Sequence, residues 1–216
     1  AGIVALLFGQ DNYGRVKGNN IFRMLQLQAK SFIKEEKLLL LSLRTIVCHV
    51  PFVAFVLFWQ IYATEVIHIE TKYLAFFLLV FMVLLMLGNY AVSIFTRKIS
   101  NLGTSIAGII ISILGFVLLF VLPSFPGFVM GAGLIEFGFG VEQSATSTWM
   151  CDCIESETRS AYSSIFSTIQ SVAGFIIMNL LGVLTEWNGV NAAWCVAAVA
   201  MGVDLSLIHI SEPTRP

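Results

Sequence analysis

The stretch from Gly127 to Met150 constrains the fold most, because it is long enough to cross a lipid bilayer yet carries charge at its centre. About 20 apolar residues, each rising 1.5 Å, span the hydrocarbon layer. Glu136, Glu142 and Gln143 lie inside the stretch. A carboxylate at that depth costs at least about 2.5–3.5 kcal/mol, so it faces protein or a water-filled cavity and not lipid. The stretch therefore predicts a helix surrounded by other helices.

The composition of the whole chain fits a membrane protein. Of its 216 residues, 57% are hydrophobic and only 12% are charged, whereas soluble domains carry roughly 25% charged residues. The net charge of −1 gives no indication of a nucleic-acid partner. No nucleotide loop of the GxxxxGK[ST] type, no HExxH and no GxSxG occurs. We therefore expect neither an enzyme, nor a cofactor, nor nucleic-acid binding.

Six apolar runs predict an all-α membrane protein, a six-helix transmembrane bundle. Pro51 lies at the centre of the first run and favours a kink there. The last run is short, which predicts a truncated sixth helix. The runs are Leu38 to Tyr62, Tyr73 to Thr96, Leu102 to Leu122, Gly127 to Met150, Ser160 to Leu184, and Asn191 to Asp204.

The segments outside residues 38–204 have separate interpretations. Residues 1–9 are apolar but too few to span, and they predict the end of a preceding transmembrane helix. Residues 10–37 are polar and predict a linker, although part of this segment also fits a helix on the membrane surface. Residues 205–215 resemble a translated sequencing adapter, so we expect 205–216 to be a non-native tail. The chain is then a fragment at both ends.

Basic residues collect on one side of the predicted membrane. Six Lys or Arg lie in residues 10–37, and Arg97, Lys98 and Arg159 lie in later connections on the same side. The connections on the opposite side hold one basic residue, Lys72. Because Lys and Arg collect on the cytoplasmic side, residues 10–37 are predicted to be cytoplasmic and the first span to run outward.

Polar side chains inside the first span are candidates for a substrate or proton pathway. His49 and Gln60 are eleven residues apart, three helical turns, so they share a face, and Trp59 lies close to that face. This stripe fits a pathway, and it equally fits a packed core with one satisfied histidine.

The two glutamates of the fourth span are the second set of candidates. Glu136 and Gln143 share a helix face, whereas Glu142 points roughly 120° away from Glu136. One glutamate can then be functional while the other pairs with a neighbouring helix. Glu136 lies nearer the middle of the membrane and is the stronger candidate for binding a proton or a cationic group.

Two further sets of residues have mainly structural interpretations. Cys151 and Cys153 make half a zinc site at most, and reduced thiols are the simpler interpretation. Small polar residues on one side of the fifth span favour helix packing over substrate contact. They are Ser164, Ser167, Thr168, Ser171 and Asn179.

The layout resembles the C-terminal half of a major facilitator superfamily transporter. Arg97 and Lys98 occupy the turn in which that family has a basic motif, and Gly88 stands for its leading glycine, although the usual Asp is absent. Residues 159–164 (RSAYSS) resemble the family's RAxxxS-type start of the fifth span. Residues 182–189 (GVLTEWNG) resemble its G-x-L-x-[DE]-x-x-G close.

The resemblance implies half of a twelve-helix fold that moves a small solute across the cell membrane by alternating access, with proton coupling as one option. It implies that the first and fourth helices line a central cavity and that the third and sixth face lipid. The partners are then the solute, the lipid bilayer and the missing N-terminal half of the protein. A receptor or scaffold bundle that transports nothing is the alternative.

Overall fold

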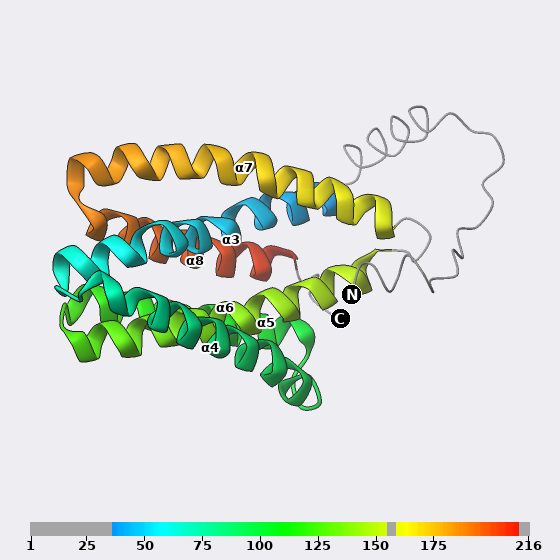
Figure 1. Cartoon of the computed structure of the whole chain (residues 1–216). Helices are drawn as coiled ribbons and strands as arrows, with labels where there is room; N and C mark the ends of the chain where they lie inside the picture. Colours follow the sequence, from blue (N-terminus) through cyan, green and yellow to red (C-terminus); the bar gives the residue numbers. More distant parts are fainter. Residues whose placement is uncertain (1–35, 155–158, 212–216) are drawn as a thin grey trace, which may run out of the picture. The chain divides into compact units, whose positions relative to one another are not determined.

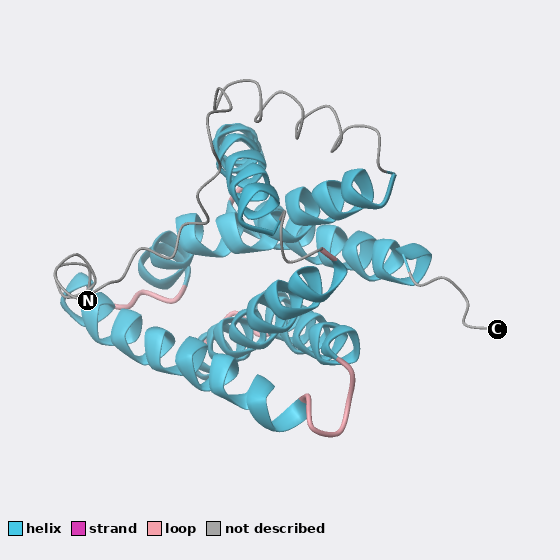
Figure 2. Cartoon of the chain, turned by 90° about the vertical axis from the view of Figure 1, so that its right-hand side faces the viewer, coloured by secondary structure: helices cyan, strands magenta, loops and turns pink. Residues whose placement is uncertain are grey.

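The computed structural model describes residues 36–154 and 159–211. Residues 1–35, which hold the predicted end of a preceding helix and most of the linker, lie outside the described part, as do 212–216. Long helices dominate what is described, and the prediction of an all-helical bundle is confirmed (Figures 1 and 2). They are α3 (Glu36–Ile61), α4 (Leu74–Phe95), α5 (Asn101–Val121), α6 (Phe125–Cys153), α7 (Arg159–Asn188) and α8 (Val190–Ser211).

Five stretches of the described residues are long and apolar enough to cross a membrane. The sixth helix, α6, has 29 residues and is long enough, but its polar residues set it apart from the other five. It packs along α4 and α5, which supplies the protein surroundings that its carboxylates need. The five stretches are Leu38–Val66, Thr71–Phe95, Asn101–Val121, Tyr162–Asn188 and Val190–Ile208.

Helix ends differ from the predicted ends where capping decides them. α6 begins before the predicted Gly127 because Ser124 is its N-cap and accepts a hydrogen bond from the Gly127 amide at 3.4 Å. The predicted turn over 185–190 shrinks to Gly189, whose φ of +75° reverses the chain between α7 and α8.

The last helix is longer than predicted. α8 runs on to Ser211 and so includes residues 205–211, which the sequence assigns to a non-native tail. Ile208 is only 1% exposed. The apolar character of these residues lets them continue the helix whatever their origin, and the origin of the tail stays a prediction.

The described helices form two groups of three. α6 packs along α4 and α5 in one group (the α6 group), and α3 packs along α7 and α8 in the other (the α3 group). Figure 1 shows the α3 group above the α6 group. The two groups are related by the order of the helices along the chain. When α3, α4 and α5 are matched in order with α6, α7 and α8, the members of the α3 group correspond to the members of the α6 group. This is the pattern of an internal structural repeat, a common feature of transporter folds.

Glycines bring the backbone of α6 close to its two neighbours. A Cβ added at Gly108 of α5 would lie 2.6 Å from the Glu142 amide nitrogen, where no side chain fits. Small residues at helix crossings in membranes allow this close approach. The facing pairs are Gly88 with Gly140, Gly108 with Gly138, and Gly115 with Gly131.

An aromatic cluster joins the two groups. Phe55 of α3 is fully buried, and its ring centroid lies 6.0–6.3 Å from those of Phe81, Phe116, Phe139 and Trp194. These four rings come from α4, α5, α6 and α8. Aromatic pairs at such distances add stability beyond the area they bury. We call these five residues the Phe55 cluster.

The glycine contacts give a direct test of the packing. Gly108→Ala is expected to destabilise the protein by about 1–3 kcal/mol, because its methyl group meets backbone that cannot give way. Gly182→Ala is the matched control, since nothing lies within 4 Å of a Cβ there and alanine favours a helix. Thermal unfolding of the purified protein in detergent measures both. A Gly182→Ala protein that loses as much stability as Gly108→Ala would contradict the packing.

Candidate functional site

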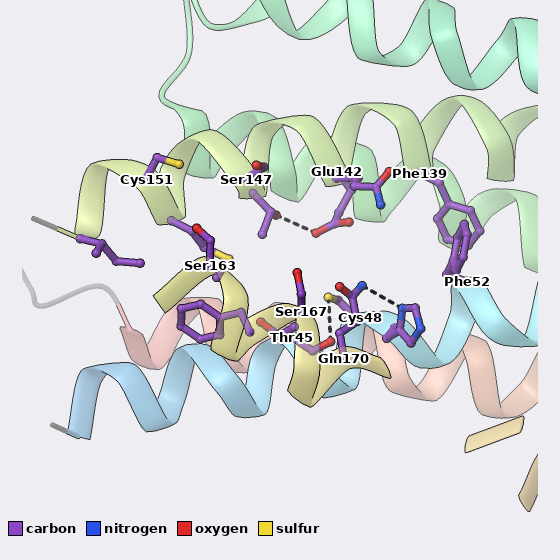
Figure 3. Close-up of a pocket in the computed structure, with 16 residues that line it drawn as sticks. Thr45, Cys48, Phe52, Phe139, Glu142, Ser147, Cys151, Ser163, Ser167 and Gln170 are labelled. Atoms are coloured by element: carbon purple, nitrogen blue, oxygen red, sulfur yellow. Dashed lines mark hydrogen bonds between the residues drawn. The ribbon is translucent and has the colours of Figure 1, made fainter. Parts of the chain in front are cut away.

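The described bundle contains a cavity of about 280 Å³, lined by residues of α3, α6 and α7 (Figure 3). It lies toward the end of the bundle at which α3 and α7 begin and α6 ends. Phe52 and Phe139 lie at its inner end, with their ring centroids 5.8 Å apart in an edge-on contact. Cys151 and Ser163 lie at its opposite end. That this opposite end is cytoplasmic stays a prediction from the distribution of basic residues.

Glu142 supplies the charged group of the cavity wall. Its side chain is 13% exposed, and in Figure 3 it projects from α6 toward Cys48, Ser167 and Gln170 on the facing helices. Its Oε1 accepts a hydrogen bond of 2.7 Å from the Thr146 hydroxyl one turn along the same helix. The cavity therefore presents a carboxylate that is held on one side and faces open space on the other.

Behind Glu142 lies a buried arginine. Arg44 of α3 is 3% exposed, and its Nη2 lies 3.6 Å from Oε1 of Glu142. Its Nε donates to Oδ1 of Asp204 on α8 at 3.1 Å, and Nη2 donates to the hydroxyls of Ser105 at 2.8 Å and Thr146 at 3.0 Å. We call these five residues the Arg44 cluster.

The Arg44 cluster joins helices of both groups. Arg44 and Asp204 belong to the α3 group, whereas Ser105 of α5 and Glu142 of α6 belong to the α6 group. The guanidinium also lies over the ring of Trp149, 5.1 Å from its centroid, where a cation is attracted to the aromatic face. One side chain thus holds α3, α5, α6 and α8 together.

The hydroxyl groups of the cluster form a chain with a fixed direction. Each hydroxyl has one proton to donate. Thr146 donates its proton to Glu142, so it accepts from Arg44 and from Ser105, which lies 2.9 Å away. Ser105 in turn accepts from Arg44. The positive guanidinium begins this chain and the carboxylate ends it.

On the opposite wall, α3 and α7 are joined by a neutral pair. Nδ1 of His49 lies 3.0 Å from Nε2 of Gln170. The amide nitrogen donates, so Nδ1 accepts and the proton of a neutral His49 lies on Nε2. The imidazole also stacks on Phe52, with 5.6 Å between centroids. The hydroxyl group of Ser167 lies on the same wall.

The structure brings together three of the predicted pathway residues. His49, Glu142 and Gln143 line the cavity. Glu136 does not line it: this half-buried residue lies six residues farther outward on α6, and it has no hydrogen bond or ion pair with other described residues. Its role stays a prediction.

The outer part of the predicted stripe on α3 does not reach the cavity. Trp59 is 4% exposed and packs in the aromatic core, with its ring 5.3 Å from that of Phe81. Gln60 is exposed near the outer end of α3. The packed-core interpretation therefore fits Trp59, because Phe81 of α4 packs against its ring, a contact that the stripe alone does not show.

The predicted cytoplasmic motif residues lie at helix connections. Arg97 and Lys98 are exposed in the turn between α4 and α5, and neither forms an ion pair with another described residue. Arg159 begins α7 and donates from Nη2 to the carbonyl of Ile154 at 3.4 Å. These positions leave the motif assignment a prediction.

The structure changes the interpretation of α7. Ser167, predicted to serve packing, lines the cavity. Thr168, Ser171 and Asn179 donate to carbonyl groups of their own helix rather than across an interface. Cys151 also lines the cavity, while the side chain of Cys153 lies outside the described part.

No protein-family model and no curated protein matches the chain. Among solved structures it is similar to one described as an auto-inhibited POT family peptide transporter, with a TM-score of 0.70 at 16% sequence identity. The match covers 84% of this chain and 39% of that one, so the chain spans about two fifths of the transporter's length. The bundle has the fold of part of a transporter. At this identity the likeness concerns the fold alone.

Arg44 and Asp204 are absent from the candidates that the sequence suggests, although a signal for each exists. Residues at helical spacing form the buried stripe of α3, and Arg44 occupies a position on it. Asp204 occupies the stripe of α8 in the same way. The stripes consist of Arg44, Pro51, Phe55, Phe58 and Tyr62 on α3, and of Trp194, Ala197, Met201, Asp204 and Ile208 on α8.

Removal of Arg44 tests the buried cluster. Arg44→Met is expected to destabilise the protein by about 3–5 kcal/mol, because it leaves Glu142 and Asp204 without a counter-charge. Arg44→Lys should lose less, since an ammonium keeps the charge but not the planar fork. Arg97→Met, at an exposed turn, is the control and should stay within about 0.5 kcal/mol. Equal losses of thermal stability for Arg44→Met and Arg97→Met would contradict the account.

Proposed function

We propose that the chain is the C-terminal half of a secondary transporter of the major facilitator superfamily type, which moves a small polar solute across the cell membrane. The observation that carries this proposal is the cavity of about 280 Å³ with a buried carboxylate in its wall, set within a transporter-type bundle. An intramembrane ionisable residue that faces a cavity is typical of a solute or ion pathway.

The groups around the cavity favour a solute with a positive charge. Glu142 offers a carboxylate, and Gln143, Ser163 and Ser167 offer neutral hydrogen-bonding groups. Aromatic rings at the inner end suit an apolar part of the solute. The structural neighbour is described as a peptide transporter. A small peptide combines an ammonium, an amide and a short apolar side chain, so we use it as the first candidate.

The arrangement of the helices in two groups supports a proposal of alternating access. The cavity lies between α3 and α7 of the α3 group and α6 of the other group. Phe52 and Phe139 lie in contact at its inner end, which supports the proposal that in this state the pathway leads to the cytoplasmic side. We propose that rocking of one group against the other, together with the missing N-terminal half, exposes the cavity to the opposite side.

The two glutamates of α6 have separate proposed roles. Glu142 binds the cationic group of the solute in the cavity. Glu136, nearer the membrane centre and without an ion pair among the described residues, binds a proton or the same cationic group as the solute passes outward. Proton coupling through these carboxylates is part of the proposal. Residues 10–37 are proposed to be cytoplasmic.

Transport by the full-length protein in proteoliposomes tests the function. Uptake of radiolabelled dialanine, alanine and a small amine is measured for the wild type and for Glu142→Gln and Glu136→Gln. Removing the carboxylate that pairs with the cationic group of the solute costs at least about 1.4 kcal/mol of binding free energy. Glu142→Gln should therefore lower uptake of the transported probe about tenfold or more. Glu65→Gln, an exposed carboxylate outside the cavity, is the matched control and should leave uptake unchanged.

The same measurement separates transport from the alternative. A receptor or scaffold bundle predicts that the α6 substitutions change the thermal stability and that the wild type moves none of the probes. That result would favour the non-transporting interpretation.

Thiol labelling tests the direction of the cavity. In a variant that keeps Cys151 and replaces the other three cysteines by alanine, a membrane-impermeant maleimide should label Cys151 from the cytoplasmic side. A bound solute should slow this labelling, because Cys151 lines the entrance. A variant with alanine at all four cysteine positions is the control and should take up no label. Labelling of Cys151 that a transported solute does not slow would contradict the assignment of the cavity.

A further inference from the structure

A second, much smaller cavity lies behind Glu142. Its volume is about 10 Å³, which is room for at most one water molecule. Glu142 lines both cavities, so it stands between the small space and the large one. Asp204 lines the small cavity from α8. The rest of its lining is a thiol and apolar side chains, namely Cys48, Pro51, Ile109, Phe139 and Met201.

One oxygen of Asp204, which lines this space, has no hydrogen-bond partner among the described residues. Asp204 is 1% exposed, and while its Oδ1 accepts from Arg44, its Oδ2 is buried without a partner among the described residues. The thiol of Cys48 already donates to the Thr45 carbonyl at 3.4 Å. An ionised carboxylate only accepts, so two acceptors meet in a space whose own lining offers no free donor. Nη1 of Arg44 is also buried without a partner among the described residues, but Arg44 does not line this space.

The charges around the space do not balance. Two carboxylates face one guanidinium, which stays protonated throughout. The neighbouring elements supply no further cation: α5 contributes Ile109 to the lining, and described residues of α4 and α7 contribute none. His49, beside Cys48, lines the large cavity only. With both carboxylates ionised, the Arg44 cluster would carry an excess negative charge inside the membrane, which is strongly disfavoured.

We propose that Glu142 and Asp204 share one proton across the small cavity, directly or through a single water molecule. The proton supplies both missing features, a donor for Oδ2 of Asp204 and one positive charge for the cluster. A metal ion suits the space less well, because hard cations take six or more oxygen ligands and most of these walls are apolar.

The position of Glu142 connects this proton to the large cavity. A hydronium ion in the water of the large cavity transfers its proton to Glu142 and leaves a water molecule, and the acid then donates to Asp204. A cationic solute that binds Glu142 favours its ionised form, so the proton is held by Asp204 or returns to water. This coupling rests on the transport function proposed above, whereas the shared proton itself does not.

Infrared spectroscopy of the full-length protein in lipid nanodiscs tests the shared proton. A protonated carboxyl group has a C=O stretching band distinct from carboxylate bands. We expect such a band in the wild type at neutral pH and its loss in both Glu142→Gln and Asp204→Asn. Either neutral amide removes the excess charge, so the remaining carboxylate pairs with Arg44 in its ionised form. If Glu142 or Asp204 held the proton alone, without sharing it, the band would remain when the other of the two residues is replaced.

Two matched control variants distinguish the band of the shared proton from the bands of other carboxyl groups. Glu65→Gln, at an exposed site, should leave the spectrum unchanged. Glu136→Gln should remove only the absorption of the Glu136 carboxyl group itself. Labelling the aspartate carboxyl carbons with ¹³C needs no substitution and so serves if a variant fails to fold. The chain has three aspartates, Asp11, Asp152 and Asp204. Asp152 is exposed, so a shifted acid band that persists when solvent-exposed groups are fully ionised, and that Asp11→Asn leaves unchanged, belongs to Asp204.

Three results would overturn the proposal. They are no acid band in the wild type at neutral pH beyond that of Glu136, a band not due to Glu136 that survives in Asp204→Asn and in Glu142→Gln, and a band that sodium chloride removes while choline chloride does not. The last result would make sodium the occupant. Because the measurement needs no solute, a shared proton in a protein that moves no probe would contradict the transport function and leave the proton site standing.

Discussion

A guanidinium buried among four helices is the contact on which the rest of this bundle depends. Arg44 reaches Asp204 on α8, Ser105 on α5 and both Thr146 and Glu142 on α6. Removing a charge from water is costly, and only several hydrogen bonds and opposite charges together offset that cost. The partners come from both three-helix groups, so the groups can separate at this end only if the arginine exchanges its partners.

The two junctions between the groups differ in a way that shapes the interior. Arg44 and Phe55 lie on one face of α3, eleven residues apart, so the same helix carries a polar junction and an aromatic one. Around Phe55 large rings fill the interior. Around Arg44 the side chains are shorter and polar, and a cavity of about 280 Å³ remains. The cavity is therefore found where directional hydrogen bonds, and not ring packing, hold the helices.

The polar helix α6 is tolerated because each of its faces has its own surroundings. Glycine contacts bring one face against α5 and another against α4, where the backbones approach too closely for a side chain. The remaining face, which carries Glu142 and Gln143, lines the cavity. The high polarity of this helix and its many glycines are thus two aspects of one requirement: it must be enclosed by protein and still present a carboxylate to open space.

The chain on its own determines which described stretches are long and apolar enough to cross a membrane, the order of the helices and the need to enclose α6. Length, apolar runs and buried charge are local properties. The chain also indicates His49, Glu142 and Gln143 as cavity residues. It does not show that Arg44 meets Asp204, 160 residues away, or that α4 packs against Trp59 while Ser167 faces the cavity. Helical spacing states which residues share a face, but which helix lies opposite that face is decided only when the six helices pack.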